Sequence, residues 1–185
     1  MSRWLCCLLL ACANSYAAPA IENASAPQVE RNALMAQLQE VRHTVADRTS
    51  ELLSTAMSFL GVPYRRGGND ADVGFDCSGF VRAAFQQAQG LLLPRRAAEQ
   101  AAATEIIDKK DLQPGDLVFF NTMRRAFSHV GIYLGEGKFI HAPRAGAQVR
   151  VESMHASYWQ RRFNGARRVA GLDEPIATAV QLDRQ

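Results

Sequence analysis

Two stretches of the chain carry apolar residues at helical spacing. In the first, a stripe between Leu52 and Leu60 ends at Gly61, a residue that favours a helix end. The second begins at Cys77, and its apolar positions are Phe80, Val81, Ala84, Phe85 and Ala88. Gly90 follows as a suitable C-terminal residue. This pattern predicts a helix whose first turn holds Cys77.

Segments that are typical of β-strands follow the helices. Runs rich in β-branched or aromatic residues and bounded by turn residues lie at 117–120, 129–134, 138–142, 148–151 and 167–170. Turns are predicted at 67–70 and 113–116. Helices that precede a run of antiparallel strands predict an α+β fold, with the cysteine-bearing helix packed on the sheet.

The hairpin around residues 135–137 is predicted to bring two histidines together. If its loop holds an odd number of residues, with Leu134 opposite Lys138, apolar side chains fill one face of the sheet. The other face then carries His129 and His141 as diagonal neighbours, roughly 7–8 Å apart at the backbone. A three-residue loop that ends in a left-handed glycine gives this register.

The chain of 185 residues, 48% of them hydrophobic, is long enough for one compact core and holds no apolar run of 18 residues. We expect a signal peptide over 1–17. The alternative is a lipobox, which leaves Cys12 as a lipidated first residue. We further expect a linker and short helix at 18–46, the folded domain at 47–171 and a loose tail at 172–185.

Of the four cysteines in the chain, one is expected to remain as a free thiol in the mature domain. Cys6 and Cys7 leave with the signal peptide, and Cys12 is either removed or acylated. The mature domain then keeps Cys77 without a disulfide partner. A helix N-terminus and a nearby imidazolium lower the pKa of a thiol from roughly 8.5 to about 3.5 to 7.5. We therefore expect a reactive thiolate, the alternative being a small buried hydrophobic residue.

The two paired histidines can supply a base for this thiol. We interpret His129 as the group that takes the thiol proton and His141 as its orienting partner, as in a catalytic triad. A two-histidine metal site is the alternative, although no third ligand has an obvious spacing. His43 and His155 lack such a context and are expected on the surface. We expect neither a metal nor a cofactor.

Charge gives a weaker signal. The formal net charge is +3, and arginines occur in pairs at 65–66, 95–96, 124–125, 161–162 and 167–168. A solvated surface is the ordinary explanation for such pairs, and attraction to an acidic polymer is the functional one. No motif is typical of nucleic-acid binding, so we expect no nucleic-acid partner. We expect a monomer.

Several motifs occur in one unbroken order. They are 61–68 (GVPYRRGG), 74–81 (GFDCSGFV), 93–100 (LPRRAAEQ), 112–120 (LQPGDLVFF) and 129–142 (HVGIYLGEGKFIHA). Together they resemble the NlpC family of bacterial cell-wall cysteine peptidases. The closing segment 158–169 (YWQRRFNGARRV) looks like the enterobacterial branch of periplasmic and lipid-anchored murein endopeptidases.

The resemblance implies a papain-like α+β fold with the nucleophile at a helix N-terminus. Matched position by position, Cys77 is the nucleophile, His129 the general base and His141 the polar orienting residue. Three further positions match residues that border the substrate in the family: Tyr64, Asp76 and Ser78. Core packing is the alternative for Tyr64, and a helix cap is the alternative for Asp76.

The function that the resemblance implies is cleavage of amide bonds in the stem peptides or cross-links of peptidoglycan. Two alternatives stay open: a non-catalytic peptidoglycan-binding module, and an acyltransferase or thioesterase that uses the same chemistry on lipid. We expect an exported protein, located in the periplasm. Contact with a membrane is expected only if Cys12 is lipidated, which would anchor the protein in the outer membrane.

Overall fold

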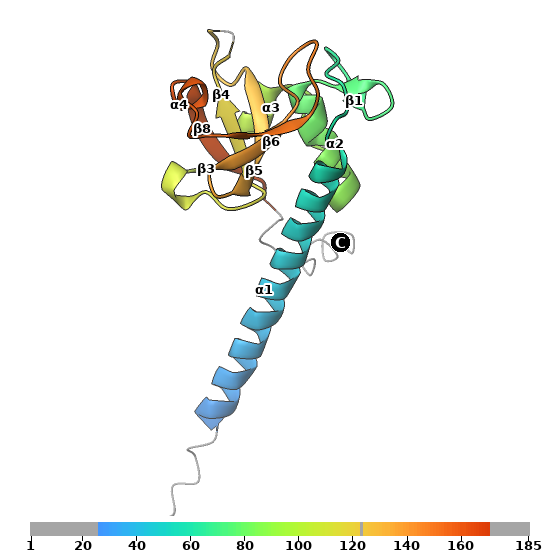
Figure 1. The fold of residues 1–185 in the computed structure, drawn as a ribbon. Coiled ribbons are helices and arrows are strands. Elements are labelled where there is room, and N and C mark those ends of the chain that lie inside the picture. The colour runs from blue at the N-terminus through green and yellow to red at the C-terminus, as the bar shows by residue number, and fades with distance from the viewer. Residues whose placement is uncertain (1–25, 123, 171–185) are drawn as a thin grey trace, which may run out of the picture. The chain divides into compact units, whose positions relative to one another are not determined.

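The computed structural model describes residues 26–122 and 124–170 (Figure 1). Its helices are α1 (Ala26–Ser58), α2 (Cys77–Gln89), α3 (Ala97–Ala102) and α4 (Ser157–Gln160), with a 3-10 turn at Lys109–Asp111. Its strands are β1 (Asn69–Asp70), β2 (Gly74–Phe75), β3 (Glu105–Ile107), β4 (Leu117–Phe120), β5 (His129–Gly135), β6 (Lys138–His141), β7 (Arg150–Ser153) and β8 (Phe163–Arg168). The predicted signal peptide, Cys12 and the predicted tail lie outside the described residues.

Residue contacts divide the chain into two units, Met1–Gln37 and Leu38–Gln185. The second unit holds all the described strands. α1 is one continuous helix, and the predicted boundary between residues 46 and 47 falls inside it. Within the second unit, Leu52 and Ala56 of α1 are buried, as is Phe59 just after the helix. These members of the predicted stripe therefore face the core, whereas Leu60 is 42% exposed.

The main sheet has six antiparallel strands in the order β3-β8-β4-β5-β6-β7. A separate two-stranded sheet joins β1 and β2, and α2 packs against β5. The predicted α+β fold, with the cysteine-bearing helix on an antiparallel sheet, is confirmed. The last strand of the described residues, β8, lies inside the sheet between β3 and β4, where it is paired on both sides.

Both faces of the sheet are buried. Leu117 and Phe119 of β4 belong to a large core with α1, α2 and α3, whereas Val118 and Phe120 belong to a smaller cluster on the opposite face. The apolar face predicted for the hairpin is confirmed, since its four members lie in the large core: Val130, Ile132, Ile140 and Ala142. Trp159 of α4 helps to cover the opposite face.

The β5–β6 hairpin reaches the predicted register by a different route. Ile132 pairs with Ile140, as expected, but Lys138 pairs with Gly135 and not with Leu134. The loop has two residues, both at positive φ, as in a type I′ turn. A register shift between Tyr133 and Gly135 adds one residue to β5. The prediction of a three-residue loop is therefore wrong, and a bulge restores the side-chain faces.

Other strand limits also differ from those predicted. β4 matches its prediction, while β7 lies at Arg150–Ser153 and not at 148–151, and β8 lies at Phe163–Arg168 and not at 167–170. β8 shows little apolar alternation, because Ala166 is its one buried residue. α3, α4 and β3 were not predicted, since segments of three to six residues are too short to show a period.

Candidate active site

Asp76 fixes the position of Cys77 at the start of α2. Its Oδ1 accepts a hydrogen bond from the Gly79 amide at 2.8 Å, which makes it the N-cap of the helix. Arg95 donates to both carboxylate oxygens at 2.9 and 2.7 Å. The same guanidinium reaches the Ser78 hydroxyl at 3.1 Å. The helix-cap alternative for Asp76 is therefore confirmed, and a role in substrate binding stays a prediction.

The two predicted histidines meet in the buried sheet. His129 begins β5 and His141 ends β6, and His129 Nε2 lies 2.7 Å from His141 Nδ1. Only 3% of His129 and none of His141 is exposed. Gly131 makes room for this pair, because a Cβ there would lie 2.8 Å from the Ile140 carbonyl oxygen and 3.1 Å from His141 Cβ.

Electrostatics at Cys77 differ from the expectation. Burial, followed by the charge of Asp76, raises the pKa of the thiol to about 11. Backbone N–H groups, including that of Val130, oppose this change but do not outweigh it. The expectation of a lowered thiol pKa is therefore wrong for the resting protein.

Both histidines are also neutral at rest. Burial, followed by the neighbouring His141, lowers the pKa of His129 to about 3. Burial likewise lowers the pKa of His141, although the nearby carboxylate of Glu152 opposes this change. The site therefore rests as a protonated thiol beside two neutral imidazoles, which is the arrangement of a general base and not of a preformed ion pair.

Two residues that contact the histidines were not predicted from the sequence as part of the site. Glu152 Oε1 lies 3.5 Å from His141 Nε2, and its other oxygen accepts a hydrogen bond from Trp159 Nε1. The Trp159 ring stacks on His129, with centroids 5.5 Å apart and planes 22° apart. Glu152 lay one residue beyond the strand predicted at 148–151. Trp159 belonged to a motif of the resemblance, but nothing in the sequence linked it to the histidines.

Two cavities meet at the thiol. Both are lined by Tyr64, Arg66, Cys77 and Ser128. The first, of about 640 Å³, extends past His129 to Glu152, Tyr158 and Trp159. The second, of about 890 Å³, extends over Asp76, Ser78, Arg95 and Arg125. The predicted residues Cys77, His129, Tyr64, Asp76 and Ser78 thus line one continuous depression, while His141 lies buried behind His129.

The arginine pairs divide into two kinds. Arg66, Arg144 and Arg150 line the first cavity, and Arg66, Arg95, Arg96 and Arg125 line the second. In contrast, Arg168 binds Asp116 through both carboxylate oxygens, and Arg167 donates to the Ala101 carbonyl. The pair at 167–168 therefore anchors β8 and is not a solvated surface. His43 and His155 are exposed, as expected.

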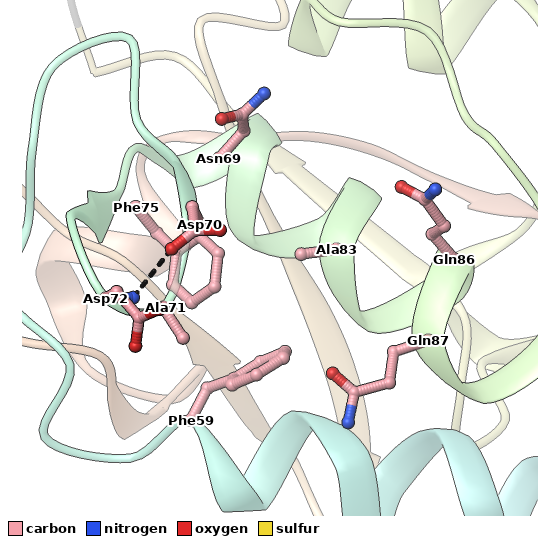
Figure 2. Close-up of a pocket in the computed structure, with 9 residues that line it drawn as sticks. All are labelled: Phe59, Asn69, Asp70, Ala71, Asp72, Phe75, Ala83, Gln86 and Gln87. Carbon is pink, nitrogen blue, oxygen red and sulfur yellow. Dashed lines mark hydrogen bonds between the residues drawn. The ribbon is translucent and has the colours of Figure 1, made fainter.

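A third hollow lies apart from these residues. Figure 2 shows Asp70, Asp72, Phe59 and Phe75 around it, with Gln86 and Gln87 from α2. The Asp72 amide donates to Asp70 Oδ1 at 2.8 Å. The hollow has a volume of about 280 Å³ and contains none of the predicted site residues.

Within 26–122 and 124–170, no group of three His, Cys, Asp or Glu side chains is placed to hold a metal ion. Over the same ranges, no helix combines the length and the apolar character needed to cross a membrane.

Comparison with known proteins extends these observations. The chain is 41% identical over 128 residues to the murein DD-endopeptidase MepH of Escherichia coli, covering 68% of this chain and 47% of that protein. It is 37% identical over 165 residues to the murein DD-endopeptidase/murein LD-carboxypeptidase MepS of Escherichia coli, covering 88% and 86%. The chain thus spans about half of the first relative and most of the second.

A solved structure and a family profile agree with these relatives. The crystal structure of an NlpC/P60 family protein from Bacillus cereus matches with a TM-score of 0.61 at 35% identity, covering 65% of this chain and 39% of that one. The profile of the NlpC/P60 family matches residues 61–168, which include Cys77, His129 and His141. The chain belongs to the NlpC/P60 family.

Proposed function

We propose that this protein is a peptidoglycan hydrolase, a cysteine endopeptidase that cleaves amide bonds in murein stem peptides or cross-links. The 2.7 Å contact between His129 Nε2 and His141 Nδ1 carries this proposal. It engages one nitrogen of His129 and leaves Nδ1 for the thiol of Cys77, which lines the same cavity. Family membership and the two murein endopeptidases among the relatives support the same substrate class.

The first step is attack by sulfur on the scissile carbonyl. The S–H bond of Cys77 breaks and its proton passes to His129 Nδ1, while sulfur bonds to the carbonyl carbon. Because the thiol and the imidazole are both neutral at rest, this proton transfer accompanies the attack. The oxyanion is stabilised by the Cys77 backbone N–H and the Tyr64 hydroxyl.

The second half of the reaction releases the two products. His129 gives its proton to the leaving amine, and an acyl-enzyme on Cys77 remains. His129 then takes a proton from a water molecule, whose oxygen attacks the acyl carbon. The C–S bond breaks, and the thiolate that leaves regains a proton from His129. His141 contacts His129 and not the substrate, so it acts as a positioning residue.

Arginines on both sides of the thiol suit a substrate rich in carboxylates. Arg66 and Arg144 line the first cavity, and Arg125 lines the second. Guanidinium groups bind carboxylates through paired hydrogen bonds. Murein stem peptides carry free carboxylates next to their amide bonds, which fits these linings. We further propose that the protein is exported and acts in the periplasm, either free or lipidated at Cys12.

Mass spectrometry of muropeptides tests the proposal. Purified cell wall is incubated with the mature chain and with its Cys77→Ala and Cys77→Ser variants. The wild type should release new peptide ends and both variants none, while circular dichroism shows all three folded. EDTA should leave the activity unchanged, since the steps above use no metal. Release of the same products by Cys77→Ala would end the proposal.

The same assay separates the alternatives. A binding module would sediment with the cell wall without releasing any product. A lipid acyltransferase or thioesterase would act on acyl thioesters and leave muropeptides intact. His129→Ala should lose about 10² to 10⁴ in rate, the range typical of general-base catalysis, and His141→Ala should lose less.

A further inference from the structure

Glu152 is placed to act on the histidine pair, although it comes from a different strand. β6 and β7 pair with His141 opposite Arg150 and Phe139 opposite Glu152. Glu152 is therefore a diagonal neighbour of His141 on the same face of the sheet, within reach of its ring. Its Oε1 lies 3.5 Å from His141 Nε2.

The hydrogen-bonding needs of His141 point to the same residue. His141 is fully buried, and its Nε2 makes no hydrogen bond within the described residues. The acceptor that it faces is the Glu152 carboxylate at 3.5 Å. A buried N–H without an acceptor is unfavourable, because it loses its hydrogen bond to water without replacing it. Glu152 is held in place by Arg150, whose Nε donates at 2.5 Å, and by Trp159 Nε1.

The contact of Glu152 with His141 determines which nitrogen carries the proton in each of the two histidines. A carboxylate only accepts hydrogen bonds, so His141 must carry its proton on Nε2 to bind Glu152. His141 Nδ1 is then an acceptor, and the 2.7 Å contact requires His129 to carry its proton on Nε2. His129 Nδ1 is left with a lone pair on the side of the ring that is not bound to His141.

We propose that Glu152 is a positioning residue that holds His141, and through it His129, in the tautomer that leaves His129 Nδ1 free to accept the Cys77 proton. When that proton arrives, the S–H bond breaks, the Nδ1–H bond forms and His129 becomes a cation. The carboxylate stabilises this charge through His141, and no proton leaves either ring toward Glu152. The proposal rests on the role of His129 as base given above.

Trp159 contacts both Glu152 and His129. Its indole N–H binds Glu152, and its ring stacks on His129 and meets the edge of His141 at 5.1 Å and 86°. α4 thus fixes the carboxylate and the base ring with one side chain. The charged groups that act on the two histidines are Glu152 and Arg150, both from β7.

Long-range ¹⁵N NMR of the mature chain tests the proposal without any assay of activity. Neutral His129 and His141 should both show the Nε2–H tautomer at pH 7. The exposed His43 and His155 provide solvent-exposed reference signals in the same spectrum. An Nδ1–H tautomer at either buried ring in the wild type would overturn the proposal, whether or not the protein cleaves peptidoglycan.

The Glu152→Gln variant provides the second measurement. A glutamine has one acceptor oxygen, which cannot bind Trp159 Nε1 and His141 Nε2 as two carboxylate oxygens do. We expect mixed tautomers at His141 and a loss in kcat/KM of roughly tenfold to a hundredfold, as for carboxylates that orient other histidines. Loss of the negative charge disfavours protonation of the two histidines, so the acid limb of the pH profile of kcat/KM should move to lower pH.

The Glu136→Gln variant is the matched control. Glu136 lies in the β5–β6 turn, is 85% exposed and pairs only with Lys138 among the described residues, so its loss removes the same charge away from the histidines. It should leave the tautomers and both limbs of the pH profile unchanged. A merely structural role for Glu152 would lower the rate without moving the acid limb or the tautomers, and that result would overturn the proposal.

Discussion

Burial sets the resting chemistry of Cys77. The free amides at the start of α2 favour a thiolate, but removal of the sulfur from water and the adjacent carboxylate of Asp76 favour the thiol, and the pKa is about 11. The same carboxylate caps the helix that presents the cysteine. Asp76 therefore positions Cys77 while making its thiol less acidic. In the proposed reaction, activation of this thiol depends on His129, whose neutral ring can accept a proton.

Asp76→Asn should make Cys77 more reactive toward iodoacetamide. Asparagine still caps the helix, while the variant removes a negative charge that raises the thiol pKa and frees the positive charge of Arg95. Each unit by which the pKa falls increases the thiolate fraction at pH 8 roughly tenfold. The rate of alkylation, followed by mass spectrometry from pH 7 to pH 11, measures the change.

Asp70→Asn is the control for this measurement. Asp70 lies on β1 at the hollow of Figure 2 and is not among the groups that shift the pKa of Cys77. Its substitution should leave the alkylation curve in place. An unchanged curve for Asp76→Asn would show that the carboxylate does not act on the thiol.

The β5–β6 hairpin illustrates what a sequence can predict. Its apolar residues define one face of the sheet. The register that gathers them there places His129 and His141 together on the opposite face. The predicted loop was wrong, yet the pairing of Ile132 with Ile140 was right. Side-chain pattern determines register more strongly than loop length does, because a bulge can absorb one residue at little cost, whereas a register slip would expose the core.

The contacts of Glu152 and Trp159 could not be predicted in this way. The segment 142–149 separates β6 from β7, so no short turn defined the pairing that brings Glu152 to His141. α4 has four residues, fewer than the two turns needed to display a helical period. The triad candidates follow from local patterns, while the groups that support them depend on tertiary packing.

Gly131→Ala should disturb the histidine pair from within β5. The new Cβ would lie 2.8 Å from Phe139 Cδ2 and 3.1 Å from His141 Cβ, so β6 must shift. We expect a loss of about 1–3 kcal/mol in the free energy of unfolding from overpacking. Muropeptide release should fall as well, because His141 moves away from His129. Urea denaturation and the muropeptide assay measure the two effects.

Gly90→Ala is the control that separates a loss of stability from a displacement of the histidine pair. Gly90 has φ of 67°, and a Cβ added there would meet no atom within 4 Å, so its substitution costs about 1–2 kcal/mol through backbone strain alone. This C-terminal residue of α2 lies outside both cavities at the thiol. Its variant should lose stability and keep activity. Equal loss of activity in both variants would mean that stability, and not the histidine pair, explains the effect at Gly131.

One buried ion pair connects β8 to the turn that precedes β4. Arg168 at the end of β8 donates to both oxygens of Asp116, which is 1% exposed and precedes β4. Asp116 also accepts from the Gln113 amide and so shapes the turn before that strand. The pair therefore joins the C-terminal strand to the centre of the sheet.

Arg168→Ala should destabilise the protein strongly. It leaves the carboxylate of Asp116 buried without its cation, a change that typically costs about 3–5 kcal/mol. Lys110→Ala is the control, because Lys110 and Asp108 form an exposed pair at 3.8 Å that contributes little. The midpoint of urea denaturation should fall for Arg168→Ala and stay in place for Lys110→Ala. Equal midpoints would contradict the anchoring role.

The position of β8 has a consequence for the order of events during synthesis. Ribosomes make the chain from its N-terminus, so β3 and β4 emerge before the strand that separates them. Until Phe163–Arg168 has emerged, β3 has no partner and one edge of β4 is open. The nascent chain therefore cannot close this sheet before β8 has been made. A sheet that closes only with β8 keeps its earlier strands incompletely paired while the intervening segments are synthesised, so the unit folds late and not strand by strand.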